Sequence, residues 1–243
     1  MIPKTIHYCW FGKNKKPKLI KKCIKSWKKY CPDYQIIEWN EDNFDINYNE
    51  YVKEAYRLKK WAFVSDVARI YALVKCGGVY LDTDMELIKP IDYYLSLKAF
   101  CGREDLSCVG TAILGCEKNF PLFKDLLLEY EKENFTANQN GLYRTITDRL
   151  TMFVQRNGEY LIAQDVMQNI DELTVYPIHY FYPKDMSTGI LDKIENSYAI
   201  HHGCNSFLSS KDRLRIKLFK FFNRVFGKKF SSFLYKILGR GRQ

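Results

Sequence analysis

The chain has 243 residues, of which 47% are hydrophobic and 16% aromatic, and its formal net charge is +10. This composition suits one large or two small folded domains and excludes a disordered chain. No stretch reaches the roughly 18 to 20 apolar residues of a membrane-spanning helix, and the N-terminus lacks a secretory pattern, so we expect a protein that is soluble or peripheral to a membrane.

The positive charge is concentrated near the C-terminus. Residues 211–243 hold eleven basic residues and one acidic residue, which leaves 27 of each kind in the rest of the chain (38 less 11, and 28 less 1). A neutral body without a nucleic-acid motif argues against nucleic-acid binding, although a local basic patch is compatible with it. The eight cysteines form no C-x-x-C pair, so we expect reduced thiols rather than a zinc or redox motif.

The first forty residues predict a β-α-β opening. Residues 5–11 and 34–39 have the apolar and aromatic composition of buried strands. Between Pro17 and Pro32, apolar residues recur at helical spacing and lysines fill the other face. Such an opening favours an α/β sheet that binds ligands at the carboxyl ends of its strands.

Two further helices are expected at residues 49–58 and 61–76. The second contains Asp66 and Arg69, which lie three residues apart and are therefore neighbours on a helix surface. They could form a solvated salt bridge of a few tenths of a kcal/mol. Alternatively, they could turn toward a crevice shared with the strand that follows.

Residues 77–84 predict a short buried strand that ends in two aspartates. Two glycines end the helix, Val79 to Leu81 suit a buried strand, and Asp82 and Asp84 follow. Side chains at i and i+2 of an extended backbone point the same way, so both carboxylates could converge on a divalent cation and a phosphate. The alternative is a polar turn without a ligand.

The second half predicts more strands and helices and ends on two histidines. Strands are expected at residues 99–102, 110–115, 175–178 and 196–200, and helices at 121–132 and 141–156. The last strand delivers His201 and His202, which face opposite sides, so at most one of them can reach a metal. A lone histidine is more often a hydrogen-bonded core or surface residue.

Four motifs together resemble a sugar-transferase family. They are Ile2-Pro-Lys-Thr-Ile-His-Tyr-Cys-Trp10, Ser65-Asp66-x-x-Arg69, Gly77-Gly-Val-Tyr-Leu-Asp-Thr-Asp84 and Ala199-Ile-His-His-x-x-x-Ser206. The resemblance is to the DxD-containing family of bacterial capsular-polysaccharide glycosyltransferases and fungal Golgi mannosyltransferases, which is distantly similar to the glucosyltransferase domains of large clostridial toxins. It implies a GT-A-type single domain at residues 1–210, with a mixed central sheet flanked by helices.

The resemblance also implies roles for individual residues. Asp84 would bind Mn²⁺ or Mg²⁺ directly, Asp82 would meet the ribose or reach the metal through water, and His201 would complete the metal site. Asp66 and Arg69 would hold the donor sugar and its diphosphate, and Trp10 would lie near the base. Ser65, Tyr80 and Ser206 lie in the same motifs and are expected to bind the donor; Asp66, Arg69, Asp82 and Asp84 are the expected catalytic set.

The last motif departs from the family pattern. The family usually ends it in Ser-Trp, whereas Phe207 follows Ser206 here. If the tryptophan ring nitrogen donates a hydrogen bond to the leaving phosphate, phenylalanine cannot replace it. Donor turnover or loop closure would then be weakened.

Residues 211–243 form a separate unit with its own expected role. Leu214, Leu218, Phe221 and Val225 fall on one side of a helix and Lys217, Lys220 and Arg224 on the other, so the tail predicts one or two basic amphipathic helices. We favour an anionic membrane surface as its partner, and the alternative is docking on the body or on a second subunit.

The resulting expectation is a metal-dependent, retaining glycosyltransferase of bacterial surface polysaccharide synthesis. Its donor would be a nucleotide-sugar, with a UDP-sugar favoured, and its acceptor a glycan that is lipid-linked. It would be cytoplasmic and peripheral at the inner face of the cell membrane. The alternatives are a catalytically weak or inactive sugar-nucleotide-binding module, another metal phosphotransfer enzyme, or a nucleic-acid-binding protein; neither the oligomeric state nor the sugar follows from the sequence.

Overall fold

A computed structural model describes residues 1–137, 139, 141–158 and 163–203, with residues 218, 221, 224 and 225. In chain order its elements are β1 (Thr5–Cys9), α1 (Lys18–Tyr30), β2 (Gln35–Trp39), α2 (Glu50–Arg57), α3 (Trp61–Cys76), β3 (Gly78–Leu81), β4 (Met85–Leu87), the 3₁₀ helix η1 (Asp92–Ser96), β5 (Ala99–Arg103), β6 (Val109–Cys116), α4 (Pro121–Glu131), α5 (Ile146–Asn157), β7 (Gln168–Ile170), β8 (Leu173–Tyr176), α6 (Ile178–Phe181) and β9 (Ala199–His201).

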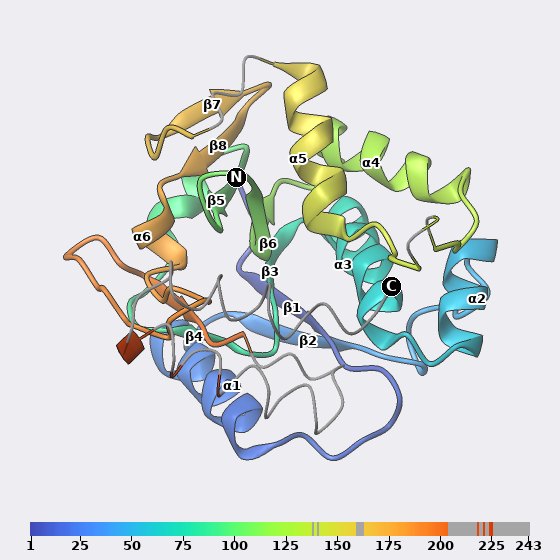
Figure 1. Ribbon diagram of the computed structural model, residues 1–243, viewed down its shortest axis with the longest axis horizontal. Helices are drawn as coiled ribbons and strands as arrows, with labels where there is room; N and C mark the ends of the chain where they lie inside the picture. The colour runs from blue at the N-terminus through green and yellow to red at the C-terminus, as the bar shows by residue number, and fades with distance from the viewer. Residues whose placement is uncertain are drawn as a thin grey trace.

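A seven-stranded mixed sheet forms the centre of the molecule, in the order β2-β1-β3-β6-β5-β8-β7 (Figure 1). The strands β2, β1 and β3 run parallel, whereas β6 runs antiparallel to both β3 and β5. The short strands β4 and β9 pair separately, with Met85 opposite His201. The chain therefore brings residue 201 back beside the segment that follows β3.

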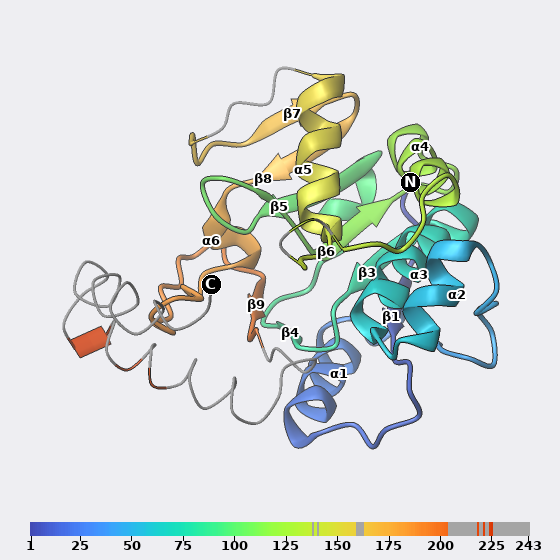
Figure 2. The ribbon, with the colours of Figure 1, turned by 45° about the vertical axis from the view of Figure 1, so that its right-hand side comes forward.

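Both faces of the central sheet are covered. Helices α2, α3, α4 and α5 contribute to one hydrophobic cluster, and α1, η1, α6 and the β4–β9 pair contribute to the other (Figures 1 and 2). Strand β3 supplies both layers, because Tyr80 belongs to the first cluster whereas Val79 and Leu81 belong to the second. This is the buried strand expected from its apolar sequence.

The turn between α3 and β3 requires its two glycines. Gly77 and Gly78 have φ values of 67° and 107°, which side chains rarely adopt. A Cβ at Gly78 would also lie 2.7 Å from the Thr5 carbonyl oxygen. The two glycines therefore allow the chain to turn from α3 into β3, and they allow β3 to pair closely with β1.

The structure confirms the expected α/β class, the mixed sheet and the β-α-β opening. It corrects several boundaries. Helix α5 begins at Ile146 rather than at 141, because the Thr145 side chain caps it and the Asp148 carboxylate returns a hydrogen bond to the Thr145 backbone. Strand β8 ends at Tyr176 and α6 follows, while β9 begins only at Ala199.

Candidate active site

Asp82 and Asp84 lie in a turn at the carboxyl end of β3. The backbone N–H of Asp82 still donates to the Ala112 carbonyl of β6 at 2.8 Å, and the N–H of Met85 then donates to the Asp82 carbonyl at 2.9 Å. The expectation that an extended backbone aligns the two carboxylates is therefore wrong. A turn brings them together instead, and it presents both beside β9.

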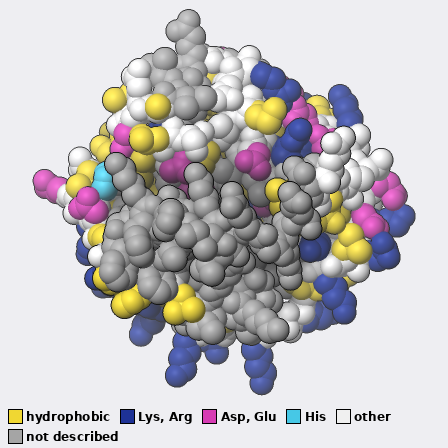
Figure 3. Space-filling view, viewed as in Figure 1, with side chains coloured by type: hydrophobic (Ala, Val, Ile, Leu, Met, Phe, Trp, Pro, Cys, Tyr) yellow, Lys and Arg dark blue, Asp and Glu magenta, His cyan; other side chains and the backbone are white. Residues whose placement is uncertain are grey.

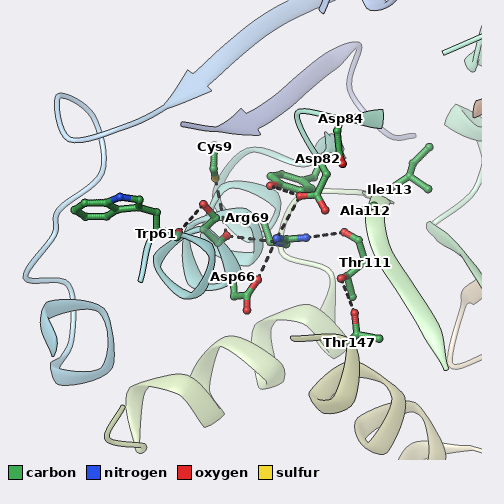
Figure 4. A network of polar contacts seen from close by, with 12 residues as sticks. Cys9, Trp61, Asp66, Arg69, Asp82, Asp84, Thr111, Ala112, Ile113 and Thr147 are labelled. Carbon is green, nitrogen blue, oxygen red and sulfur yellow. Dashed lines mark hydrogen bonds and ion pairs between the residues drawn. The ribbon is translucent and has the colours of Figure 1, made fainter. Parts of the chain in front are cut away.

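Arg69 is the centre of a buried polar network under this turn (Figure 4). Its Nη2 lies 3.0 Å from Asp66 Oδ1 and 3.3 Å from Asp82 Oδ1. Its Nη1 donates to the Thr111 carbonyl at 2.8 Å, and its Nε donates to the Ser65 carbonyl at 3.4 Å. The guanidinium also lies over the Tyr80 ring, 4.6 Å from the centroid. One side chain thus joins α3, β3 and β6.

The Asp66–Arg69 pair is not a solvated salt bridge, because the two side chains are only 8% and 6% exposed. Burial raises the pKa of Asp66 to about 6, although the charge of Arg69 partly offsets this effect. Burial alone would lower the pKa of Arg69, but the charges of Asp82, Tyr80 and Asp66 raise it. Arg69 is therefore a permanent cation in an environment that holds little water. The low dielectric constant there strengthens its electrostatic attraction for an anion.

The two histidines at the end of β9 face opposite sides, as their adjacent positions predict. His201 Nε2 lies 3.4 Å from Asp84 Oδ1, whereas His202 Nε2 lies 2.8 Å from Glu86 Oε2. The N–H of His202 donates to the Asp84 carbonyl at 3.1 Å, which fixes the backbone between them. His201 is the histidine placed at the carboxylate pair.

Glu104 is a site residue that the sequence analysis missed. It follows β5, and its Oε1 lies 3.6 Å from Nδ1 of His201, on the ring edge opposite Asp84. Burial would lower the pKa of His201, but the Asp84 and Glu104 carboxylates outweigh it and raise that pKa to about 10. No motif marked Glu104, because only the pairing of β4 with β9 brings His201 to this loop.

The carboxylates and the imidazole fit a divalent metal, because the carboxylates that favour a proton on His201 would equally favour a metal cation that replaces this proton. One ligand atom from each of Asp82, Asp84 and His201 lies within 4.8 Å of the others. An octahedral ion with bonds of about 2.1 Å separates its ligand atoms by about 3 to 4 Å, which is close to the spacing of these three atoms. Oxygen and imidazole ligands together suit Mn²⁺, and Mg²⁺ prefers the oxygens.

Two threonine side chains lie between Arg69 and helix α5 and extend the polar network (Figure 4). The Thr111 and Thr147 hydroxyl oxygens lie 3.1 Å apart, one on β6 and one in the first turn of α5. Their sequence neighbourhoods gave no signal, because the two segments meet only through the fold. They extend the candidate site from the carboxylates to the start of α5.

The remaining predicted site residues have different positions. Trp10 lines an open pocket of about 320 Å³ with Lys13, Asn14, Lys16, Glu38, Asn40, Glu41 and Asp42, and no residue of the Arg69 network lines it. The Ser65 hydroxyl bonds to the Trp61 carbonyl of its own helix, whereas the Tyr80 hydroxyl donates to Asp82 Oδ1. Ser206 and Phe207 lie outside the described residues.

The fold and the site define a GT-A-like α/β protein with a carboxylate pair at the end of a central strand. Residues 17–100 match the family described as "glycosyltransferase sugar-binding region containing DXD motif". The region that matches includes Asp66, Arg69, Asp82 and Asp84. This match confirms the family resemblance drawn from the four motifs.

Individual relatives agree with the family match. Inositol phosphoceramide mannosyltransferase 3 of Schizosaccharomyces pombe is 26% identical over 156 residues, which cover 60% of this chain and 41% of the yeast protein. An uncharacterised glycosyltransferase of Acanthamoeba polyphaga mimivirus is 29% identical over 172 residues, covering 65% of this chain and 68% of the viral protein. The chain thus spans less than half of the yeast relative.

The solved structure of the PaToxG glycosyltransferase shares the fold. It superposes with a TM-score of 0.50 at 20% identity, over 64% of this chain and 68% of that one. At this identity the likeness concerns the fold alone, and it agrees with the expected GT-A type.

Proposed function

We propose that this protein is a metal-dependent glycosyltransferase that moves a sugar from a nucleotide-sugar to a glycan acceptor. The observation that carries the proposal is the meeting of Asp82, Asp84 and His201 within 4.8 Å, beside the buried Arg69. Loss of the nucleotide places negative charge on the leaving diphosphate. A bound divalent ion and a fixed guanidinium are the groups that stabilise such charge.

Each residue has a definable task in this reaction. Asp84 and His201 would hold the metal, and Asp82 would reach it directly or through water. Arg69 is anchored by the Thr111 carbonyl and two carboxylates, so its position is set before the donor arrives. Asp66 would accept hydrogen bonds from donor-sugar hydroxyls, and the Trp10 pocket would take the base.

We further propose that transfer retains the anomeric configuration and that the donor is a UDP-sugar. Both follow from the family resemblance, as does a role in bacterial surface polysaccharide synthesis. A lipid-linked acceptor is supported by the names of two relatives, both inositol phosphoceramide mannosyltransferases of Schizosaccharomyces pombe, which point to a lipid acceptor for those proteins.

The proposed location is the inner face of the cell membrane, reached through residues 211–243. Most of this segment lies outside the described residues. Within it, Leu218, Phe221 and Val225 are helical and 52%, 59% and 54% exposed, at the spacing of one helix face. No helix among the described residues is long and apolar enough to cross a bilayer. Truncation after Ser210 should weaken co-sedimentation with anionic vesicles if the tail contributes to the contact.

The proposed activity can be tested with a panel of UDP- and GDP-sugars, by following metal-dependent donor hydrolysis and transfer. Asp84→Asn should abolish both while the protein stays folded. Asp125→Asn, on the exposed face of α4, is the matched control and should keep full turnover. Wild-type turnover in Asp84→Asn would refute the assignment, and donor binding without turnover across the panel would favour the inactive binding module.

A further inference from the structure

Residues 1–210 carry equal numbers of basic and acidic residues, but the surface around α1 is strongly basic. Between Gly12 and Cys31 the chain has nine lysines and no acidic residue. The segment comprises the loop after β1 and the whole of α1, which forms the lower edge of the molecule in Figure 1. Lys and Arg side chains project from this same edge in the space-filling view (Figure 3).

Helix α1 separates its side chains into two faces. Ile20, Cys23, Ser26 and Trp27 are buried against the body. At 100° per residue, the six lysines at positions 18, 21, 22, 25, 28 and 29 fall within an arc of about 120° on the other side. All six are exposed. The lysines therefore form one continuous stripe along the helix.

Most of these charges have no acidic partner among the residues whose placement is described. Lys16 pairs with Glu38 at 2.7 Å and Lys22 with Glu86 at 2.9 Å. In the part of the chain that the structure describes, no carboxylate pairs with the other seven, which are Lys13, Lys15, Lys18, Lys21, Lys25, Lys28 and Lys29. We name these seven lysines the α1 lysine face. Their mutual repulsion is relieved by an anionic partner.

The α1 lysine face is rigidly connected to the candidate active site. The Trp27 indole N–H donates to the Met85 carbonyl at 2.7 Å, and the Leu87 N–H donates to the Ser26 hydroxyl at 3.0 Å. Met85 directly follows Asp84, so α1 is bonded to the strand that leaves the carboxylate turn. A partner bound to α1 would therefore fix the orientation of the site.

We propose that the α1 lysine face docks the protein on an anionic membrane surface. Five of these ammonium groups lie on α1 and two on the loop before it. Together, with no carboxylate partner among the described residues, they complement a plane of lipid phosphates, to which each lysine contributes by its charge alone. This contact is additional to the one proposed for residues 211–243, and it does not depend on the proposed transfer reaction. It would hold the carboxylate turn in one orientation relative to the membrane, where the lipid-linked acceptor proposed above would lie.

The composition of the face favours lipid phosphates over a nucleic acid. It contains lysine but no arginine, the residue that reads phosphates and bases with two parallel hydrogen bonds. Its tryptophan, Trp27, is fully buried and offers no surface on which a base could stack. A diffuse lipid surface requires neither feature.

The test compares two full-length variants with equal changes in charge. One replaces Lys18, Lys21, Lys25 and Lys28 of α1 by glutamine, and the control replaces the exposed Lys75, Lys118, Lys124 and Lys132 by glutamine. Partitioning is measured by sedimentation with vesicles of phosphatidylcholine, alone or mixed with phosphatidylglycerol, at about 0.1 M and about 0.5 M salt. Circular dichroism confirms that each variant is folded.

Each lysine that reaches the headgroups raises the partition coefficient about fivefold. If only two of the four replaced lysines reach the headgroups, the α1 variant should bind anionic vesicles about 25-fold more weakly than the wild type at low salt. If more of them do, the loss should be larger. The control should keep wild-type partitioning. The proposal is overturned if both variants bind like the wild type, if the control loses as much as the α1 variant, or if the face binds single- or double-stranded nucleic acid more tightly than vesicles at equal salt.

Discussion

Arg69 Nη2 lies 3.3 Å from Asp82 Oδ1, although the two residues come from different elements, a helix and the turn after the next strand. The same guanidinium reaches the Asp66 carboxylate and the Thr111 carbonyl. Removal of its fork geometry should therefore affect both the fold and the site.

Arg69→Lys should lower transfer by about 100-fold or more, because an ammonium group cannot keep all these partners and still face a diphosphate. It should also lower the free energy of unfolding by about 3 kcal/mol, since buried charges lose a partner. Chemical denaturation and donor turnover measure the two effects. The control is Arg57→Lys, whose exposed pair with Glu54 contributes little to stability. Comparable losses in both variants would contradict the central role of Arg69.

The two adjacent histidines should behave differently. His201→Gln should weaken Mn²⁺ binding by about 100-fold, because it removes a ligand that faces Asp84. His202→Gln should leave Mn²⁺ affinity within about threefold of the wild type, because its ring faces Glu86 instead. Isothermal titration calorimetry with Mn²⁺ alone gives both values. The reverse order would assign the metal to His202.

Glu104 should act through His201. Nε2 of the ring is directed at Asp84, and Nδ1 lies 3.6 Å from the Glu104 carboxylate. Carboxylates placed beside a metal-binding histidine typically change metal affinity by about 10- to 100-fold. Glu104→Ala should show this loss, and Glu104→Gln should recover part of it because its amide oxygen would keep an acceptor beside Nδ1. Glu86→Gln is the matched control on the other histidine. Unchanged Mn²⁺ affinity in Glu104→Ala would disprove the effect.

The ionised Asp66 carboxylate should destabilise the fold, although we expect it to bind the donor sugar. Burial raises the pKa of Asp66 to about 6, so at neutral pH the folded protein holds an ionised carboxylate in an unfavourable environment. Asp66→Asn should therefore keep or raise the melting temperature, yet lose donor-sugar turnover by about 100-fold. Differential scanning calorimetry and a donor assay check the pair of outcomes. A melting temperature several degrees below that of the wild type would show that the ion pair with Arg69 dominates instead.

His7 should make the fold sensitive to acid. The Trp39 indole N–H donates to His7 Nδ1 at 3.0 Å, so the ring hydrogen lies on Nε2 and is donated to the Gly77 carbonyl at 2.8 Å. Burial lowers the pKa of His7, and a second proton would face the indole N–H.

This neutral histidine stabilises the fold above its unfolded pKa of 6.5, and the contribution is lost as the pH falls below that value, because the unfolded chain then binds more protons. The melting temperature of His7→Gln should therefore fall less steeply than that of the wild type between about pH 6.5 and pH 5. Parallel curves for the two proteins would exclude His7 as the source.

Local sequence identified the elements whose signals are short-range. The apolar run after Gly77-Gly78, the Asp82-x-Asp84 pair and the Asp66-x-x-Arg69 spacing each lie within one element or one turn, so their residue types alone revealed them. The alternation of side chains along a strand also predicted that only one of His201 and His202 meets the carboxylates. The lysines of α1 were visible too, as the polar side of an amphipathic helix.

The tertiary structure decided which of these residues meet. Strand β3 pairs with β6, more than 25 residues later, and β4 pairs with β9, more than 100 residues later. Such pairings depend on burial and register across the whole sheet, which no local pattern encodes. They brought Thr111 to Arg69 and Glu104 to His201, and they replaced the expected extended arrangement of Asp82 and Asp84 by a turn. They also left the α1 lysine face without acidic partners among the described residues, because ion pairing depends on the elements packed nearby rather than on sequence charge.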